Sequence, residues 1–250
     1  MKQLTKVQKR FAAVVLMLCL SMAVAPTVSA MHIMEGYLPP VYCISWIVIC
    51  IPFLAVGFNK IRNTVSENPR AMTLIAVSGA FVFIVSSLKI PSVTGSCSHM
   101  TGTGLAAILF GVSTTSVLGL IVLIFQAILL AHGGLTTLGA NCFSMAIAGP
   151  VVSWLIFKGL TKAKANKKIA VFLAAMIGDL FTYCVTAFEM ALAHHSDTGI
   201  GVALVKFLAV FAPTQVPLAI IEGILTVVII MALESLAAKE LKSIGYVVEA

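Results

Sequence analysis

The sequence predicts an all-α integral membrane protein, a bundle of about seven transmembrane segments. Of its 250 residues, 60% are hydrophobic and only 10% are charged. Soluble domains are about half apolar and about a quarter charged. Long apolar runs also recur along the chain, and a spanning helix needs roughly 20 mostly apolar residues. Both observations place the chain in a lipid bilayer, and the absence of a basic face excludes a nucleic-acid role.

The first 30 residues are expected to be a cleaved signal peptide. Four basic residues precede an apolar stretch over residues 11–25, and Ala30 closes a small-residue cleavage pattern. Cleavage after Ala30 leaves one transmembrane metal-binding domain, residues 31–250, that begins at Met31. It keeps 12 of the 16 basic residues against nine acidic ones, a formal charge of +3.

A free N-terminus at Met31 followed by His32 is a metal-binding pattern. The terminal amine, the His32 backbone nitrogen and the His32 ring nitrogen can close two small chelate rings on one ion. Nitrogen-rich, nearly planar sites suit Ni(II), Cu(II) or Co(II) better than Ca²⁺ or Mg²⁺. The alternative is that His32 is an ordinary solvated side chain near a chain end.

The apolar runs are interpreted, in order, as membrane segments. They cover residues 41–58, 71–88, 102–131, 142–157, 169–193 and 202–233. The uncharged run 102–131 is too long for one comfortable span, and Gly111 and the Ser/Thr cluster after it divide the run. We interpret it as two short helices, about 102–112 and 114–131, or as a re-entrant hairpin. Counting it twice gives seven segments.

Basic residues between the segments set the orientation, because short cytoplasmic loops collect Lys and Arg. Residues 59–70 hold three of them, residues 158–168 hold five, and the C-terminal tail holds Lys239 and Lys242. The remaining links hold only Lys89: they are residues 89–101, 132–141 and 194–201. We therefore expect the mature N-terminus outside and the C-terminus in the cytoplasm.

This topology brings His32 and His99 to the same outer face, where two imidazoles and an amine can converge on one metal ion. His99 lies beside Cys97 and Met100 in a polar, Gly-rich stretch, which is a plausible ligand cluster. The alternative is an ordinary loop that re-enters a helix. The five cysteines of the mature chain have scattered spacing that matches neither a disulfide framework nor a zinc motif.

Ionisable side chains inside the apolar runs are functional candidates, because burying a charge is costly. We expect Asp179 and Glu222 to be structural or to face a partner, and a proton relay is the alternative. His194, His195 and Asp197 lie in an outer loop and either gather cations or form a solvated turn. The sequence has no phosphate-binding loop of the G-x-x-x-x-G-K-[ST] type and no usual hydrolase motif, so it predicts a binding subunit rather than an enzyme.

Five stretches together resemble the CbiM family of cobalt-transport proteins, over most of residues 31–235. They are MHIMEGYLP at 31–39, GSCSH at 95–99, TGTG at 101–104, LLAHGGLTTLGAN at 129–141 and QVPLAIIEG at 215–223. The resemblance implies a metal bound by the Met31 amine, the His32 backbone and ring nitrogens, and His99. Met100 stands where we expect the family to have Pro, which leaves the metal preference in question.

The resemblance also implies a physiological role. The family is the substrate-binding S component of an energy-coupling-factor (ECF) type ABC importer in the bacterial cytoplasmic (inner) membrane, and it supplies cobalt for cobalamin biosynthesis. Co²⁺ would be the transported substrate, with Ni²⁺ as the alternative. The implied partners are an accessory small membrane subunit, a transmembrane coupling protein and cytoplasmic ATP-binding subunits. The competing hypotheses are a nickel importer subunit and a self-sufficient proton-coupled metal carrier.

Overall fold

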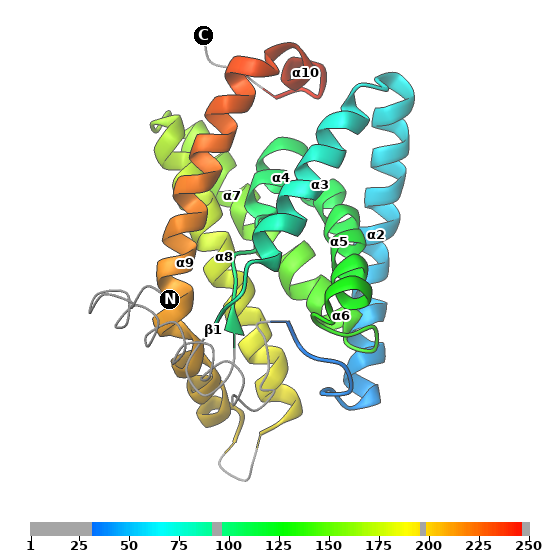
Figure 1. Ribbon diagram of the computed structural model, residues 1–250, viewed down its shortest axis with the longest axis vertical. Helices are drawn as coiled ribbons and strands as arrows, with labels where there is room; N and C mark the ends of the chain where they lie inside the picture. The colour runs from blue at the N-terminus through cyan, green and yellow to red at the C-terminus, as the bar shows by residue number, and fades with distance from the viewer. Residues whose placement is uncertain (1–31, 92–96, 196–198, 247–250) are drawn as a thin grey trace, which may run out of the picture.

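Every predicted membrane run contains a helix in the computed structural model, which describes residues 32–91, 97–195 and 199–246 (Figure 1). A backbone in lipid must satisfy its own hydrogen bonds, and a helix does so within one segment. The helices are α2 (Pro40–Glu67), α3 (Ala71–Ser87), α4 (Thr103–Phe110), α5 (Val112–Leu130), α6 (Leu138–Asn141), the π-helix η2 (Cys142–Ala148), α7 (Gly149–Lys162), α8 (Lys167–Ala193), α9 (Ile200–Leu236) and α10 (Ala238–Ser243).

Among the described residues, five helical stretches are long and apolar enough to cross a membrane. They are α2, α5, the continuous stretch from α6 to α7, α8 and α9. The apolar helix α3 has 17 residues and α4 has eight. The protein is therefore an α-helical membrane protein whose shorter helices α3 and α4 fall at the second predicted run and at the divided one.

Two helices extend beyond the predicted apolar runs. The polar stretch after residue 58 was expected to be a loop, but α2 continues to Glu67, and α7 likewise continues to Lys162. Ile61 and Val65 explain the extension of α2, because they lie one turn apart and both pack against the hydrophobic core. The turns between helices at this end are correspondingly shorter than predicted.

The uncharged run after Gly102 forms two helices, α4 and α5, joined at Gly111. Gly111 separates them with φ of +81°, a left-handed value that favours glycine. All eight residues of α4 are buried, so this helix lies at the centre of the bundle. Its lack of charge follows from that position, because no side of α4 faces water.

A short antiparallel hairpin precedes α4 and was not predicted. Strand β1 (Ile90–Pro91) pairs with β2 (Cys97–Ser98), with Ile90 opposite Ser98 and Pro91 opposite Cys97. The chain that follows β2 is buried from Ser98 to the first turn of α4. The loop that contains His99 therefore runs into the bundle and does not lie on its surface.

The bundle has two distinct ends (Figure 1). The α2–α3 turn, the α7–α8 turn and α10 lie at one end, and the segment before α2, strand β1, the end of α8 and the start of α9 lie toward the other. The basic loops thus share one end, as charge placement predicted.

Candidate metal centre

Hydrogen bonds to Ile33 hold the chain around His32 in place. The Ile33 N–H donates to Asn141 Oδ1 at 2.7 Å, and Asn141 Nδ2 returns a bond to the Ile33 carbonyl at 2.9 Å. Thr137 Oγ1 also donates to that carbonyl, at 2.6 Å. Both backbone groups of Ile33 are therefore satisfied inside the bundle, and His32 is fixed one residue before them.

Glu35 joins this segment to the connection between α5 and α6. Its carboxylate accepts the backbone N–H of Leu135 and, at 3.2 Å, that of Thr136. The hydrogen bond with the Thr136 side chain is the largest influence on the pKa of Glu35, and together with these two backbone bonds it lowers that pKa by favouring the charged form. A Cβ atom at Gly134 would lie 2.5 Å from the Glu35 Cα, so the close approach requires glycine. The HIME stretch at 32–35 and the HGGLTT stretch at 132–137 therefore form one structural unit.

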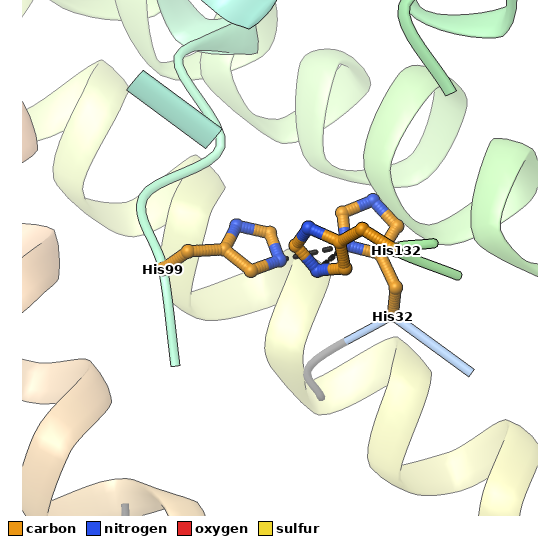
Figure 2. Close-up of side chains that lie close together, drawn as sticks. All are labelled: His32, His99 and His132. Atoms are coloured by element: carbon orange, nitrogen blue, oxygen red, sulfur yellow. Dashed lines mark hydrogen bonds between the residues drawn. The ribbon is translucent and has the colours of Figure 1, made fainter. Parts of the chain in front are cut away.

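Three imidazoles converge where this unit meets the deep loop: His32, His99 and His132 (Figure 2). His32 Nδ1 lies 2.7 Å from His99 Nε2 and 3.1 Å from His132 Nε2. The His32 and His99 rings are stacked with centroids 4.5 Å apart, and His132 is edge-on to both. All three side chains are at most 2% exposed. Three nitrogen donors thus face one point that is shielded from water.

The protonation state of His99 is set by its neighbour. His99 Nδ1 lies 2.8 Å from the Met100 carbonyl, which can only accept, so this nitrogen carries the proton. His99 Nε2 is left with its lone pair directed at His32. A backbone carbonyl that holds a ring in this way is the usual outer support of a metal-binding histidine.

Two buried carboxyl groups, those of Asp179 on α8 and Glu222 on α9, hold the loop that contains His99. Glu222 accepts the Thr101 N–H at 2.6 Å and the Thr101 hydroxyl at 2.9 Å, and Asp179 lies 3.2 Å from the same N–H. Gln215 Nε2 donates to the His99 carbonyl at 3.1 Å and to Asp179 at 2.6 Å. These contacts indicate the structural role that was expected for Asp179 and Glu222, because they connect α8 and α9 to the loop that contains His99.

Burial keeps the three imidazoles neutral. It lowers the pKa of His99 to about 4 and, with the repulsion of His99, that of His132 to about 2. The pKa of His32 is also well below its usual value, first through burial and then through its two histidine neighbours. Neutral imidazoles are the form that binds a metal, so the cluster can accept a cation at neutral pH without losing ring protons.

The structure brings together some of the predicted site residues and adds one. His32 and His99 meet as predicted, whereas Met31 lies outside the described residues. His132 was missed, although the predicted topology already put residues 132–141 on the same side as His32. The described part of this chain holds one group of three or more His, Cys, Asp or Glu side chains with metal-binding spacing, and His132 belongs to it.

The other candidates lie elsewhere. Met100 packs with Val85 and Leu218, so its thioether belongs to a small hydrophobic cluster. His194 Nε2 bonds the Tyr37 carbonyl at 2.8 Å, which makes it a contact between the outer loop and the segment before α2. The side chain of Cys97 and the whole of Asp197 lie outside the described residues.

A family model described as "CbiM: Cobalt uptake substrate-specific transmembrane region" matches residues 32–240. The chain belongs to the CbiM family. It is a transmembrane component of cobalt uptake and a multi-pass bacterial membrane protein, and membership of a transporter family implies that it is not an enzyme.

Relatives agree over nearly the full length. The chain is 63% identical to the cobalt transport protein CbiM of Lachnoclostridium phytofermentans over 245 residues, which covers 98% of both chains. It is 60% identical to the protein of the same name in Chlorobium limicola, over 86% of this chain and 85% of that one. A solved structure of a truncated transition metal transporter is similar in fold, with a TM-score of 0.72 and 26% identity, over 82% of this chain and 98% of that one.

Proposed function

We propose that this CbiM-family protein binds Co²⁺ as its transported substrate at the three-histidine cluster. The observation that carries the proposal is that two buried imidazole nitrogens, His99 Nε2 and His132 Nε2, converge on a third, His32 Nδ1, while burial lowers the pKa of all three rings. Two nitrogens that bind one ion at about 2.0–2.1 Å and at right angles to each other, as in a planar or octahedral site, lie about 2.9 Å apart. The separations of 2.7 and 3.1 Å match that spacing.

The proposed ligands are the Met31 amine, the backbone and Nδ1 nitrogens of His32, and His99 Nε2, with His132 Nε2 as a further donor. The first three come from two adjacent residues and form a chelate with one open side, which His99 fills. His32 Nδ1 points toward His99 and His132, which is the orientation this chelate needs. The amine requires cleavage after Ala30, so the signal peptide is part of the proposal.

We further propose that the chain is the substrate-binding S component of an ECF-type ABC importer that supplies cobalt for cobalamin biosynthesis. Its sequence contains no phosphate-binding loop, so energy must come from cytoplasmic ATP-binding subunits through a transmembrane coupling protein. An accessory small membrane subunit completes the set of partners. The resemblance of the Met-His and His99 motifs to the family supports this assembly.

The proposed topology has seven membrane segments, with the mature N-terminus outside and the C-terminus in the cytoplasm. The common end of the α2–α3 turn, the α7–α8 turn and α10 supports it, because these are the Lys- and Arg-rich parts of the mature chain (Figure 1). The metal centre then faces the outside, where the substrate arrives. The short helix α4 counts as one of the seven, although eight residues span only about 12 Å.

Nickel is the second candidate substrate, because an all-nitrogen site with a chelating N-terminus also suits Ni(II). The presence of His132 as a fifth nitrogen donor favours cobalt over nickel. A planar Ni(II) centre binds four nitrogens and would leave His132 without a role. A proton-coupled carrier has less support, since Asp179 and Glu222 are bonded to Thr101 and Gln215.

The proposal is tested by intact mass and N-terminal sequencing of membrane-extracted protein, followed by Co²⁺ and Ni²⁺ titration. We expect a start at Met31 and one tightly bound cobalt. His32→Ala and His99→Ala should abolish cobalt uptake by cells while membrane insertion stays normal. Retained uptake in both variants would exclude the site, and uptake by the lone chain that collapses with the proton gradient would favour a carrier.

A further inference from the structure

A second cavity lies at the end of the bundle opposite the metal centre. It has a volume of about 590 Å³ and is formed by α2, the α4–α5 turn, α7, the start of α8 and the chain that follows α10. Ligand sites usually have volumes of about 300–1,000 Å³. The cavity shares no lining residue with the metal centre.

The lining of this cavity is strongly basic. Four lysines contribute to it: Lys60, Lys158, Lys164 and Lys167. No Asp or Glu side chain lies among the lining residues. The acid Glu234 lies outside the lining and forms an ion pair with Lys167. The positive charge of the other three lysines is therefore not balanced by an acid within the cavity.

Two hydrogen-bond donors of the lining, the Lys60 ammonium and the Trp154 indole N–H, lie close to the α4–α5 turn. Lys60 Nζ donates to the Phe110 carbonyl at 2.8 Å, which holds the ammonium group inside the cavity. A Cβ atom at Gly111 would lie 3.4 Å from Lys60 Nζ and 3.8 Å from Trp154 Nε1. The Lys60 ammonium and the Trp154 indole N–H therefore both border the space in front of the Gly111 Cα. An anionic oxygen is the group that both can bind.

The surroundings indicate that the anion is carried by a lipid. The cavity lies where apolar helices meet basic turns, and aromatic Trp154 and Phe157 form part of its wall. Beside it in the chain, Phe58 is 64% exposed and Leu155 is 55% exposed. Apolar side chains exposed to this extent suit contact with acyl chains. A soluble phosphate compound would gain nothing from them.

We propose that this cavity binds the phosphate of an anionic phospholipid headgroup from the cytoplasmic leaflet. Basic pockets between transmembrane helices on the cytoplasmic side recognise such headgroups, and that leaflet is rich in anionic lipid. Membrane orientation alone would explain lysines scattered over the cytoplasmic end of the bundle. It does not explain why four lysines line one cavity that has no Asp or Glu among its lining residues. The inference rests on the orientation given under Proposed function, and it does not depend on the identity of the metal.

The test uses the full mature chain in detergent with added phosphatidylglycerol, phosphatidylcholine or inorganic phosphate. The double variant Lys158→Gln/Lys164→Gln removes two lining charges. The control Lys162→Gln/Lys242→Gln removes two charges from exposed residues at the same end that do not line the cavity. Thermal unfolding and native mass spectrometry report binding, and cobalt titration reports the state of the distant metal centre.

We expect phosphatidylglycerol to raise the unfolding temperature of the wild type and the control, and to stay bound in the mass spectrometer. The lining variant should lose both effects while its cobalt binding stays unchanged. An equal shift with phosphatidylcholine, or an equal response in both double variants, would overturn the proposal. An equal shift with inorganic phosphate would assign the cavity to a soluble anion instead. If the double variant loses cobalt binding, the single variant Lys164→Gln provides the test.

Discussion

At the scale of single residues, His32 Nδ1 is the atom on which the metal centre depends. It is the one nitrogen in contact with both other imidazoles, at 2.7 Å from His99 and 3.1 Å from His132. His32 Nε2 and His132 Nδ1 are buried and have no hydrogen-bond partner among the described residues. Buried polar atoms without a partner are costly, so the cluster is arranged for binding and not for stability.

The role of His132 is tested by His132→Ala. We expect cobalt affinity to fall by more than the about 10–100-fold that loss of an outer hydrogen-bond partner of a ligand costs, because a nitrogen donor is removed. Cobalt titration with visible spectroscopy measures both the affinity and the ligand field. His195→Ala is the matched control, since His195 is exposed and lies outside the cluster. An unchanged spectrum and affinity in His132→Ala would remove this residue from the site.

The pH dependence of binding should come from the terminal amine and the His32 backbone N–H, because both lose a proton when they bind the metal. The pKa values of His99 and His132 are lowered to about 4 and about 2, so both rings are neutral between pH 5 and 8 and release no extra proton when a metal binds. A free α-amine has a pKa of about 7.7–8.0 and must lose its proton to bind. Cobalt affinity should therefore fall at least about tenfold per pH unit below that value. Isothermal titration at pH 6, 7 and 8 measures the slope; no change across this range would argue against an amine ligand.

At the scale of elements, the loop before α4 is held by contacts with α8 and α9. Thr101 and the His99 carbonyl are bound by Asp179, Glu222 and Gln215, which come from these two helices. The π-helix η2 lies beside the same site, because Asn141 immediately precedes it and bonds Ile33. A movement of α8 or α9 would therefore change the position of His99 directly.

Close packing of α7 on α8 is tested by Gly149→Ala. A Cβ atom at this position would lie 2.0 Å from Thr182 Oγ1 and 3.0 Å from the Gly178 carbonyl. We expect a loss of about 1–3 kcal/mol, the usual cost of overpacking, and a lower unfolding temperature. Gly159→Ala in the same helix is the control, because nothing lies within 4 Å of its added Cβ. It should be neutral or stabilising by about 0.5–1 kcal/mol. Equal unfolding temperatures for the two variants would contradict this packing.

At the scale of the whole molecule, the three-histidine cluster and the lysine-lined cavity lie at opposite ends of one helical bundle. The α2–α3 turn, the α7–α8 turn and α10 lie at one end, and the segment before α2 and strand β1 lie toward the other (Figure 1). The proposed substrate site and the proposed lipid site are therefore far apart in the fold. Changes at one end can be studied with the other as an internal control.

The proposed orientation predicts the labelling of introduced cysteines. Ser66→Cys lies near the basic end of α2 and Gly201→Cys near the start of α9, and both positions are exposed. In intact spheroplasts a membrane-impermeant maleimide should label position 201 but not position 66, and permeabilisation should expose both. The wild type reports background labelling of native cysteines. The reverse pattern would invert the topology and with it the outward-facing metal site.

The sequence by itself determined the membrane class, the helical segments and the division of the uncharged run at Gly111. These features are local, because each helix in lipid satisfies its own backbone and charge sets the ends. It also predicted that His32 and His99 share one side. Only the tertiary structure decided that His132 joins them, that Asp179 and Glu222 hold the His99 loop, and that lysines from α2, α7 and α8 line one cavity. These contacts between residues far apart in the sequence depend on how the helices pack and on the path of the loops between them. Composition and periodicity do not determine either of these.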